Sequence, residues 1–414
     1  MAPDGPDPRR RDSLTERYPG LDVLVDEPPN AQTAARSNLA TPITPRDEHF
    51  VRVHHRTPEI DADEWTVSLT GMIEDEAELS MDELRGDYPT ESVVHTMECS
   101  GNGRAYFEPD AEGDQWSFGA VGNAVWTGTP VSAVLDEYGT ADEDGDDGRW
   151  LSVMGGEAPP DKDVFCRSIP LSKVREDCLL AYEMNGAPMA PEHGYPVRLV
   201  APGWFGNNSV KWVEEIRVMD GMVEGEAWTD RDGQDYTQYQ QSSYRIVPDQ
   251  DEQPDRHRSV ETTSTYDQMT GSEEVRNAYL FDQLVKSLLT MPADGATLSG
   301  SRVELSGVAW SGEDAVERVE VSTDGGESWA EAELVGPDLG RYALDRFRYV
   351  WEPEPGEHTL CSRATDERGR TQPATVSDPE AGRRGIENDE FPWNVKGYGN
   401  NAYRPLGVTV EVEA

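Results

Sequence analysis

The chain of 414 residues is short of basic side chains, and of lysine most of all. It has 36 Lys and Arg against 81 Asp and Glu, which gives a formal net charge of −45, and its five lysines are at positions 162, 173, 211, 286 and 396. Nucleic acids and anionic membranes attract clustered Lys and Arg, so neither is an expected partner. An acidic, lysine-poor surface suits a protein that stays soluble in concentrated salt, where the Debye length falls to about 3 Å. We therefore expect a halophilic protein of haloarchaeal type with a cytoplasmic location.

Cysteine and long apolar runs are scarce too. The four cysteines are too widely spaced for a disulfide framework or a zinc knuckle, and we expect reduced thiols at Cys99, Cys166, Cys178 and Cys361. The sequence has no run of about 18 apolar residues that could span a bilayer. Residues 9–11 are all Arg but are followed by acidic residues, so no export signal is expected. The 11 Trp and the dense apolar runs in the middle of the chain disfavour an acidic disordered protein.

The residues that are present change in character along the chain. Residues 1–45 are rich in Pro, Arg and Asp and predict an extended or wrapping arm. Residues 46–285 mix helix and strand patterns, and we expect the polar stretch 221–285 to lie across this part. Residues 286–414 contain short strands of alternating hydrophobicity and a hairpin turn at 324–326, which predict an immunoglobulin-like β-sandwich. The predicted fold class is α+β.

Local signals predict individual elements of the middle part. Ser80 and Glu83 have the spacing of a capping box, which predicts a short helix from residue 81. A second helix is expected within 129–139, where a Thr-Pro start, an apolar face and a final Gly occur together. The stretches 195–200 and 210–218 are rich in β-branched and aromatic residues and predict strands.

The segment from His95 to Arg104 is the most informative in the chain. It places the thiol of Cys99 just before a turn of Gly and Asn residues, with the permanent cation of Arg104 five residues after the thiol. Gly and Asn allow a sharp turn and a close backbone approach, and a nearby Arg lowers the pKa of a thiol. A single Cys is more often a small buried hydrophobe, so the segment by itself leaves both interpretations open.

With its surroundings, this segment resembles the sulfite oxidase family of mononuclear molybdenum enzymes, which includes the assimilatory nitrate reductases. The matching motifs follow one another in the family's order between about residue 45 and residue 414. They are Phe50 to His54, the Cys99 turn, Trp116 to Ala120, Trp126 to Val131, Leu179 to Gly186, His193 to Arg198, Pro202-Gly203, Ser209 to Trp212, Ala309 to Gly312 and Ser322 to Trp329. Each motif is weak alone, and their common order carries the resemblance.

The resemblance implies a molybdopterin cofactor that carries molybdenum, with Cys99 as the protein's ligand to the metal. A soft thiolate suits a metal that cycles through oxidation states, and the redox work belongs to the cofactor. By matched position, the pterin and its phosphate would be held by Phe50, Arg52, His54, His193, Arg198, Ser209, Val210 and Lys211. An acidic member of this set is expected before Ser168, but the spacing leaves open Glu157, Asp161 and Asp163. The three other cysteines are assigned to packing.

The resemblance also implies a pocket for a small oxyanion substrate. Sulfite carries two negative charges near neutral pH, so a molecule of charge −45 needs local cations to bind it. By matched position, the residues around the substrate would be Arg52, Arg104, Trp116, Tyr244 and Lys396, with Tyr239 as the substitute for Tyr244. Lys396 stands where the sulfite oxidases have an arginine, and it keeps the charge but lacks a bidentate fork. This departure leaves the physiological substrate open.

The activity implied is oxygen-atom transfer to sulfite, which gives sulfate and passes electrons to an external acceptor. We expect that acceptor to be a separate protein or small molecule, because the sequence has no haem-binding or nucleotide-binding motif. The C-terminal sandwich would pair two chains as a homodimer. Two other interpretations remain open, namely a reductase of nitrate or of an S- or N-oxide, and a cofactor-free interaction protein on the same scaffold.

Overall fold

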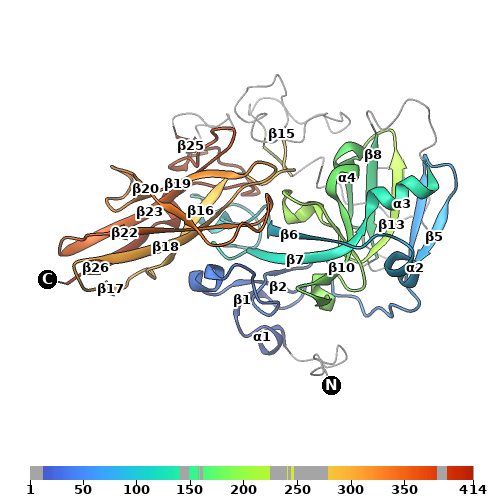
Figure 1. Cartoon of the computed structure of the whole chain (residues 1–414), viewed down its shortest axis with the longest axis horizontal. Coiled ribbons are helices and arrows are strands. Elements are labelled where there is room, and N and C mark those ends of the chain that lie inside the picture. The colour runs from blue at the N-terminus through green and yellow to red at the C-terminus, as the bar shows by residue number, and fades with distance from the viewer. Residues whose placement is uncertain are drawn as a thin grey trace.

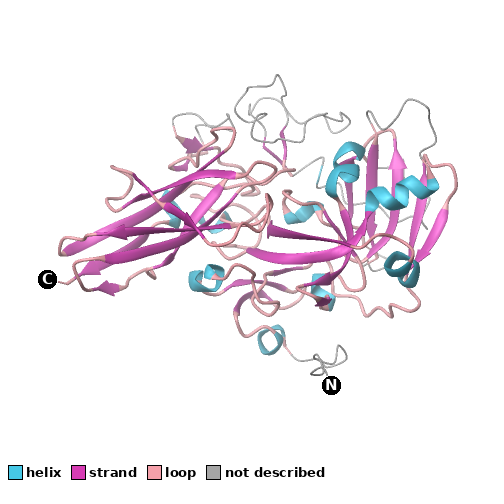
Figure 2. Cartoon of the chain, in the orientation of Figure 1, coloured by secondary structure: helices cyan, strands magenta, loops and turns pink. Residues whose placement is uncertain are grey.

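The computed structural model describes residues 13–139, 149–156, 158, 162–223, 240, 244–246, 278–379 and 389–413. These residues form a mixed α/β part and a β-sandwich that lie side by side, with the C-terminus at the far end of the sandwich (Figure 1). Strands dominate both parts, and the α-helices are short (Figure 2). Among the described residues, no helix has the length and apolar character that a membrane crossing needs. The acidic loop at 142–147, Tyr239 and most of 221–285 lie outside the described residues.

The N-terminal segment is folded against both parts. It begins with α1 (Leu14–Arg17) and continues through β1 (Leu21–Val25), β2 (Asn30–Thr33) and the 3₁₀ helix η1 (Arg36–Ala40). β1, β2 and β3 (Val51–Arg52) form an antiparallel sheet in which Asn30 lies opposite Arg52. η1 packs against strands of the sandwich. The segment is therefore joined by strand pairing to a stretch that carries expected cofactor residues.

Two five-stranded sheets form the α/β part. The first has the order β11-β10-β7-β6, with β12 also paired to β10: β6 (Glu91–Glu98), β7 (Val121–Pro130), β10 (Leu179–Met184), β11 (Ala187–Pro188) and β12 (Arg198–Val200). The second has the order β5-β4-β13-β8-β9: β4 (Thr66–Gly71), β5 (Ala77–Ser80), β8 (Trp150–Gly155), β9 (Cys166–Pro170) and β13 (Val213–Met219). Their apolar side chains share one core with the helices. The short pair β14 (Arg245–Ile246) and β15 (Ala278–Tyr279) leads toward the sandwich.

The predicted helices form as expected. α2 (Met81–Gly86) has the reciprocal capping box of Ser80 and Glu83. α3 (Val131–Tyr138) ends at Gly139 and buries its apolar face, and α4 (Leu171–Asp177) follows β9. The strand predictions at 195–200 and 210–218 are confirmed in part, because β12 starts only at Arg198 and β13 only at Val213. Pro196 has no N–H to contribute to a strand ladder, which explains the late start of β12.

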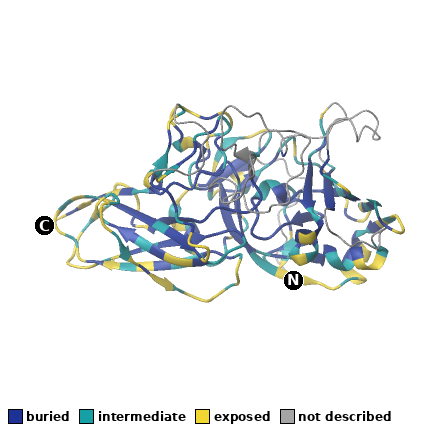
Figure 3. Ribbon diagram, turned by 90° about the horizontal axis from the view of Figure 1, so that it is seen from above, coloured by how far each residue is buried: buried dark blue, intermediate teal, exposed yellow. Residues whose placement is uncertain are grey.

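The sandwich confirms the expected second architecture. One sheet has the order β16-β18-β22-β21: β16 (Lys286–Met291), β18 (Val303–Trp310), β21 (Glu333–Val335) and β22 (Asp345–Trp351). The other has the order β17-β26-β23-β19-β20: β17 (Thr297–Leu298), β19 (Val316–Ser322), β20 (Ala330–Glu331), β23 (Gly356–Asp366) and β26 (Val408–Val412). β24 (Thr375–Val376) pairs with β25 (Glu390–Phe391) beside them. Alternate residues of the long strands are buried between the sheets (Figure 3), and the fold class is α+β as predicted.

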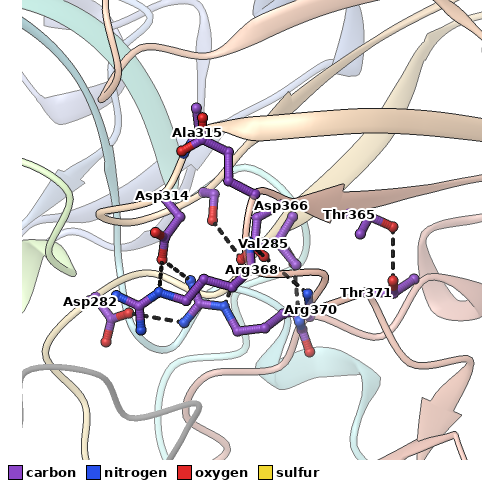
Figure 4. A network of polar contacts seen from close by, with 12 residues as sticks. Asp282, Val285, Asp314, Ala315, Thr365, Asp366, Arg368, Arg370 and Thr371 are labelled. Atoms are coloured by element: carbon purple, nitrogen blue, oxygen red, sulfur yellow. Dashed lines mark hydrogen bonds and ion pairs between the residues drawn. The ribbon is translucent and has the colours of Figure 1, made fainter.

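A buried ion-pair cluster joins the two parts. Arg370 contacts three carboxylates, with Nε 2.7 Å from Asp366 Oδ2, Nη2 2.7 Å from Asp314 Oδ2 and Nη1 3.5 Å from Asp282 Oδ2 (Figure 4). Arg368 also reaches Asp314, at 2.8 Å. Burial lowers the pKa of Arg370, but the nearby carboxylates, Asp282 and Asp366 first, raise it to a net value above its ordinary one. The division at 45 and 285 stays our proposal for the domain boundaries.

Candidate active site

One pocket of the α/β part gathers most of the expected site residues. Its volume is about 730 Å³ including the space open to solvent. Three separate stretches, around residues 49–54, 97–99 and 192–212, supply most of its wall. The lining residues are His49, Phe50, Arg52, His54, Met97, Cys99, Phe165, Glu192, His193, Arg198, Gly206, Asn207, Ser209, Lys211, Trp212 and Tyr244. The expected residues Phe50, Arg52, His54, Cys99, His193, Arg198, Ser209, Lys211 and Tyr244 are among them.

Cys99 follows directly on β6, and the turn after it is held by side chains. Asn102 donates from Nδ2 to Glu98 Oε1 at 3.0 Å and accepts from the Ala120 N–H at 3.1 Å. Gly103 has a φ of 93°, a backbone conformation that favours glycine, and a Cβ on Gly101 would lie 2.6 Å from Nη2 of Arg104, so a larger residue there would displace that guanidinium. The turn therefore fixes the direction in which the Cys99 thiol meets the pocket.

Two residues of the sandwich contact Glu98, the residue directly before Cys99. Lys286 of β16 places its Nζ 2.5 Å from Glu98 Oε1, and Trp310 of β18 donates to Glu98 Oε2 at 2.9 Å. Glu98 and Lys286 are both buried. Removing either partner would leave an uncompensated charge in the interior, so the ion pair ties the Cys99 turn to the sandwich.

The pKa of the Cys99 thiol is raised above its ordinary value. Burial raises it most, and Glu98 also raises it, whereas Arg52, the Gly101 N–H and Arg104 lower it. The expectation that a nearby arginine lowers the thiol pKa holds for the individual contributions, but burial outweighs them. The three other cysteines form no disulfide and are buried, and burial raises the pKa of Cys166 to about 12.

Two cations that line the pocket, Arg198 and Lys211, are held by main-chain contacts. Arg198 donates to the oxygens of His193 and Ser209, each at 2.9 Å. Lys211 donates from Nζ to the oxygens of Arg52 and Glu192, each at 2.7 Å. Burial lowers the pKa of Arg198 to about 9. These contacts fix the two cations beside the pocket and join the stretch around residues 49–54 to the stretch around residues 192–212.

Several buried polar atoms of the lining have no hydrogen-bond partner among the described residues. They include both ring nitrogens of His193, Nε2 of His49 and Oδ1 of Asn207. Burial lowers the pKa of His49 to about 4 and that of His193 well below its ordinary value, so both rings are neutral near pH 7. A neutral imidazole offers one donor and one acceptor. Since unpaired buried polar groups are costly, these atoms fit a polar ligand with donors and acceptors along its edge.

The expected acidic neighbour of the cofactor has one candidate in the described part of the chain. Asp163 lies beside the pocket, with Oδ1 3.5 Å from His55 Nε2 and Oδ2 4.0 Å from His54 Nε2. The main-chain oxygen of Asp163 also lies 2.7 Å from His55 Nε2. Glu157 and Asp161 lie outside the described residues.

Three of the expected substrate residues do not line the pocket. Arg104 donates from Nε to the Lys396 oxygen and from Nη1 to the Asp114 oxygen, each at 2.7 Å. Lys396 is 41% exposed and pairs with Glu112 at 2.5 Å. Trp116 is 1% exposed within the apolar cluster that packs beside Cys99. Val210, expected near the phosphate, is fully buried, and its oxygen accepts from the Leu199 N–H.

Two residues not expected from the sequence lie against Tyr244, namely Tyr398 and Arg167. Tyr398 stacks on Tyr244 with ring centroids 4.6 Å apart and shares a hydrogen bond with its hydroxyl. The guanidinium carbon of Arg104 lies 5.1 Å from the Tyr398 ring centre. Arg167 is fully buried, with its guanidinium carbon 4.0 Å from the Phe165 ring centre and 5.0 Å from that of Tyr244. Tyr398 lies two residues after Lys396, but no pattern in the sequence indicates that its ring reaches Tyr244.

Other lining residues were also missed. Met97 and Trp212 lie inside the matched segments, whereas His49 and Asn207 lie within two residues of them. Extending each motif by two residues would have included His49 and Asn207. Glu192 also adjoins a motif, but the pattern gave no reason to place a carboxylate beside a phosphate site.

Comparisons with known proteins place two family models on the chain. Residues 54–227 match the model described as the oxidoreductase molybdopterin binding domain. Residues 278–411 match the Mo-co oxidoreductase dimerisation domain. The first match contains the Cys99 turn and the stretch 192–212, and the second contains the sandwich. The N-terminal segment up to residue 53 lies outside both.

Whole-chain comparisons agree with these matches. Mitochondrial sulfite oxidase of Rattus norvegicus is 29% identical, and the match covers 98% of this chain and 68% of the rat protein. Nitrate reductase (NADH) 1 of Nicotiana tabacum is 28% identical over 87% of this chain and 38% of its own. Among solved structures, the sulfane dehydrogenase SoxCD from Paracoccus pantotrophus is similar with a TM-score of 0.71 and 26% identity, covering 100% of this chain and 96% of that one.

Proposed function

Because the chain belongs to the sulfite oxidase family of molybdopterin-dependent oxidoreductases, we propose that its pocket binds molybdopterin with Cys99 as the metal ligand and that it oxidises sulfite to sulfate. The observation that carries the proposal is the meeting of Cys99, Arg52 and the unpartnered His193 at one pocket. A thiolate, a cation and neutral hydrogen-bonding rings are the donors that a metal, a phosphate and a pterin edge require.

Different residues of the pocket wall bind different parts of the cofactor. Lys211 and Arg198 fix the stretch that presents Ser209, and we assign the phosphate end to this side. His193, His49 and Asn207 offer their unpartnered atoms to the polar edge of the pterin. Phe50 and Trp212 supply apolar surface beside it. Cys99 binds the metal, and the ion pair of Glu98 with Lys286 keeps its turn in place.

When bound, the molybdenum centre supplies the two-electron redox change and the oxygen-atom exchange. Overall, sulfite and water give sulfate, two protons and two electrons, and the electrons leave to an external acceptor. Arg52 lies at the pocket with Cys99 and attracts the oxyanion by its fixed charge. The Tyr244 hydroxyl, held by Tyr398, is a donor on the same side. Arg104 acts through its contacts with the Lys396 and Asp114 oxygens, which close the substrate side.

A second candidate substrate is a sulfane sulfur. It is favoured by the side chains of Lys396 and Arg104, which contact Glu112 and main-chain oxygens and do not line the pocket. A dianion gains most from several convergent cations, whereas a sulfane sulfur needs fewer and suits the paired rings of Tyr244 and Tyr398. The whole-chain similarity to a sulfane dehydrogenase supports this candidate. Reduction of nitrate is a third, supported by the similarity to a nitrate reductase.

Steady-state assays with molybdenum-replete protein test the proposal. We expect turnover of sulfite with ferricyanide as acceptor, and no turnover of nitrate with reduced viologen. A persulfide with ferricyanide is the parallel assay for a sulfane sulfur, because thiosulfate is itself a dianion. A protein that carries molybdenum and pterin but fails to oxidise sulfite would contradict the proposed substrate. Absence of both metal and pterin after expression in a cofactor-competent host would favour a cofactor-free interaction protein.

The remaining parts of the proposal concern assembly and environment. We propose a homodimer formed through residues 278–411, the part that matches the dimerisation domain. The net charge of −45 and the five lysines support a halophilic, cytoplasmic protein. Sedimentation across a salt series tests both, since unscreened acidic surfaces should separate the protomers as salt is lowered.

A further inference from the structure

The N-terminal segment meets the pocket at one carboxylate. Nη1 of Arg17, in α1, forms an ion pair with Glu192 Oε1, and the Tyr18 hydroxyl donates to Glu192 Oε2 at 2.8 Å. The side chain of Glu192 is 3% exposed, and that of Arg17 is 31% exposed. Glu192 itself lines the pocket. Both oxygens of this buried carboxylate are thus bound by residues of the N-terminal segment.

Glu192 occupies a sensitive place in the pocket wall. Its main-chain oxygen accepts from Lys211 Nζ at 2.7 Å, and the next residue is His193, whose ring nitrogens have no hydrogen-bond partner among the described residues. The Tyr18 ring stacks on the His193 ring, with centroids 6.0 Å apart and planes inclined by 19°. An unpaired carboxylate here would repel an anionic ligand and would cost desolvation energy.

The N-terminal segment also contacts a second part of the pocket wall, the stretch around Arg52. β2 pairs with β3, where Asn30 lies opposite Arg52, and the Asn30 side chain accepts from the Val53 N–H at 3.2 Å. Leu14, Tyr18 and Leu21 pack with Val51 and with Trp212, a lining residue. The N-terminal segment therefore contacts both of the stretches whose main-chain oxygens accept from Lys211, at Arg52 and at Glu192.

We propose that the N-terminal segment, through Arg17 and Tyr18, is a positioning device that neutralises Glu192 and thereby retains the anionic pterin cofactor in the pocket. The proposal rests on the proposed function only in taking molybdopterin as the ligand. It assigns a role to residues 13–25, which lie outside the residues matched to the molybdopterin binding domain. Arg17 and Tyr18 act through Glu192, and neither lines the pocket.

The test compares charge variants of the full chain. Arg17→Gln removes the cation and leaves the carboxylate, Glu192→Gln removes the carboxylate, and the double variant removes both. Arg175→Gln is the matched control, because Arg175 is 25% exposed and pairs with Asp136 on helices away from the pocket. The readouts are molybdenum per chain, fluorescence of the oxidised pterin, the rate of pterin loss on dialysis, and the thermal midpoint.

We expect Arg17→Gln to lose pterin about tenfold faster than the parent, as when one partner of a buried charge pair is truncated. The double variant should return close to the parental rate, because no unpaired carboxylate remains, and Arg175→Gln should match the parent. Tyr18→Phe keeps the ring beside His193 and removes one donor, so it should lose pterin at an intermediate rate. Tyr18→Phe also tests the inference if Arg17→Gln fails to fold.

Two outcomes would overturn the inference. One is parental pterin retention in both Arg17→Gln and Tyr18→Phe. The other is a double variant as defective as Arg17→Gln, which would make the contact a packing feature without a charge role. A parent without any pterin would overturn the proposed function together with this inference, whereas a pterin-loaded parent with unaffected variants would overturn this inference alone.

Discussion

Two clusters of buried polar groups in this protein differ in whether those groups have hydrogen-bond or ion-pair partners. At the junction of the two parts, Arg370 is surrounded by Asp282, Asp314 and Asp366 (Figure 4). At the pocket, His193 and Asn207 present buried atoms that have no partner among the described residues. The first cluster satisfies its charges within the chain, whereas the second leaves polar atoms available for the ligand that we propose.

The lysines also differ from one another in their burial and in the groups that they contact. Lys286 and Lys173 are buried and pair with carboxylates, while Lys211 binds main-chain oxygens at the pocket. Lys396 is exposed and pairs with Glu112. In a chain that has few lysines, the ones that remain inside occupy positions where a compact cation holds two segments together.

The largest expected effect concerns the thiol of Cys99. Cys99→Ala should abolish activity and lower the molybdenum content, because it removes the proposed metal ligand. Cys361→Ala is a control, since this buried thiol lies in the sandwich. Enzyme assay, elemental analysis and circular dichroism measure the outcomes. Parental activity in Cys99→Ala would remove the ligand assignment.

Replacing Arg370 should destabilise the fold without changing the chemistry of the pocket. Arg370→Met leaves buried carboxylates unpaired, and breaking a buried pair costs about 3–5 kcal/mol of unfolding free energy. Arg368→Met is the control, because Arg368 is 43% exposed and an exposed pair contributes up to about 1 kcal/mol. Urea unfolding measures both. Equal losses in the two variants would contradict the distinction between buried and exposed pairs.

Arg52 and Lys396 should differ in their effect on the reaction. Arg52→Met should cost about 2–4 kcal/mol in the transition state, as for the loss of an oriented donor. Lys396→Met should cost less than about 1 kcal/mol, because its partner Glu112 lies at the surface. The ratio of kcat/KM values for sulfite measures both. A large loss in Lys396→Met would mean that this side chain turns into the pocket during turnover.

The effect that is smallest at neutral pH is a pH dependence of stability from buried histidines. Burial, with Lys173 and Arg198 nearby, lowers the pKa of His95 to about 3, and its Nδ1 accepts from the Gly203 N–H at 3.3 Å. An unfolded histidine has a pKa of about 6.5. Between these values only the unfolded state takes up the proton, so the free energy of unfolding should fall as pH falls from about 6.5 toward 3.

Urea unfolding at several pH values checks this slope. His95→Gln should have a shallower slope than the parent, whatever its absolute stability, because one titrating group is lost. An unchanged slope in His95→Gln would exclude His95 as a contributor.

Much of the fold and part of the site could be predicted from the sequence. The capping box at Ser80, the helix before Gly139 and the alternating strands of the sandwich depend on neighbours close in the chain, and all are observed. The order of motifs indicated the family and the stretches that meet at the pocket. The directions of Arg104 and Lys396 could not be predicted, because main-chain oxygens and Glu112, from other parts of the chain, decide them.

The sequence by itself determined the acidic surface, the family and the thiol that follows β6, because composition and local motif chemistry carry this information. The tertiary structure alone decided which charges face the pocket and which are used to hold the chain together. Glu192 meets Arg17 across 175 positions, and Glu98 meets Lys286 across 188. Ion pairs of such separation depend on how sheets and sandwich pack, since burial makes an unpaired charge too costly to leave.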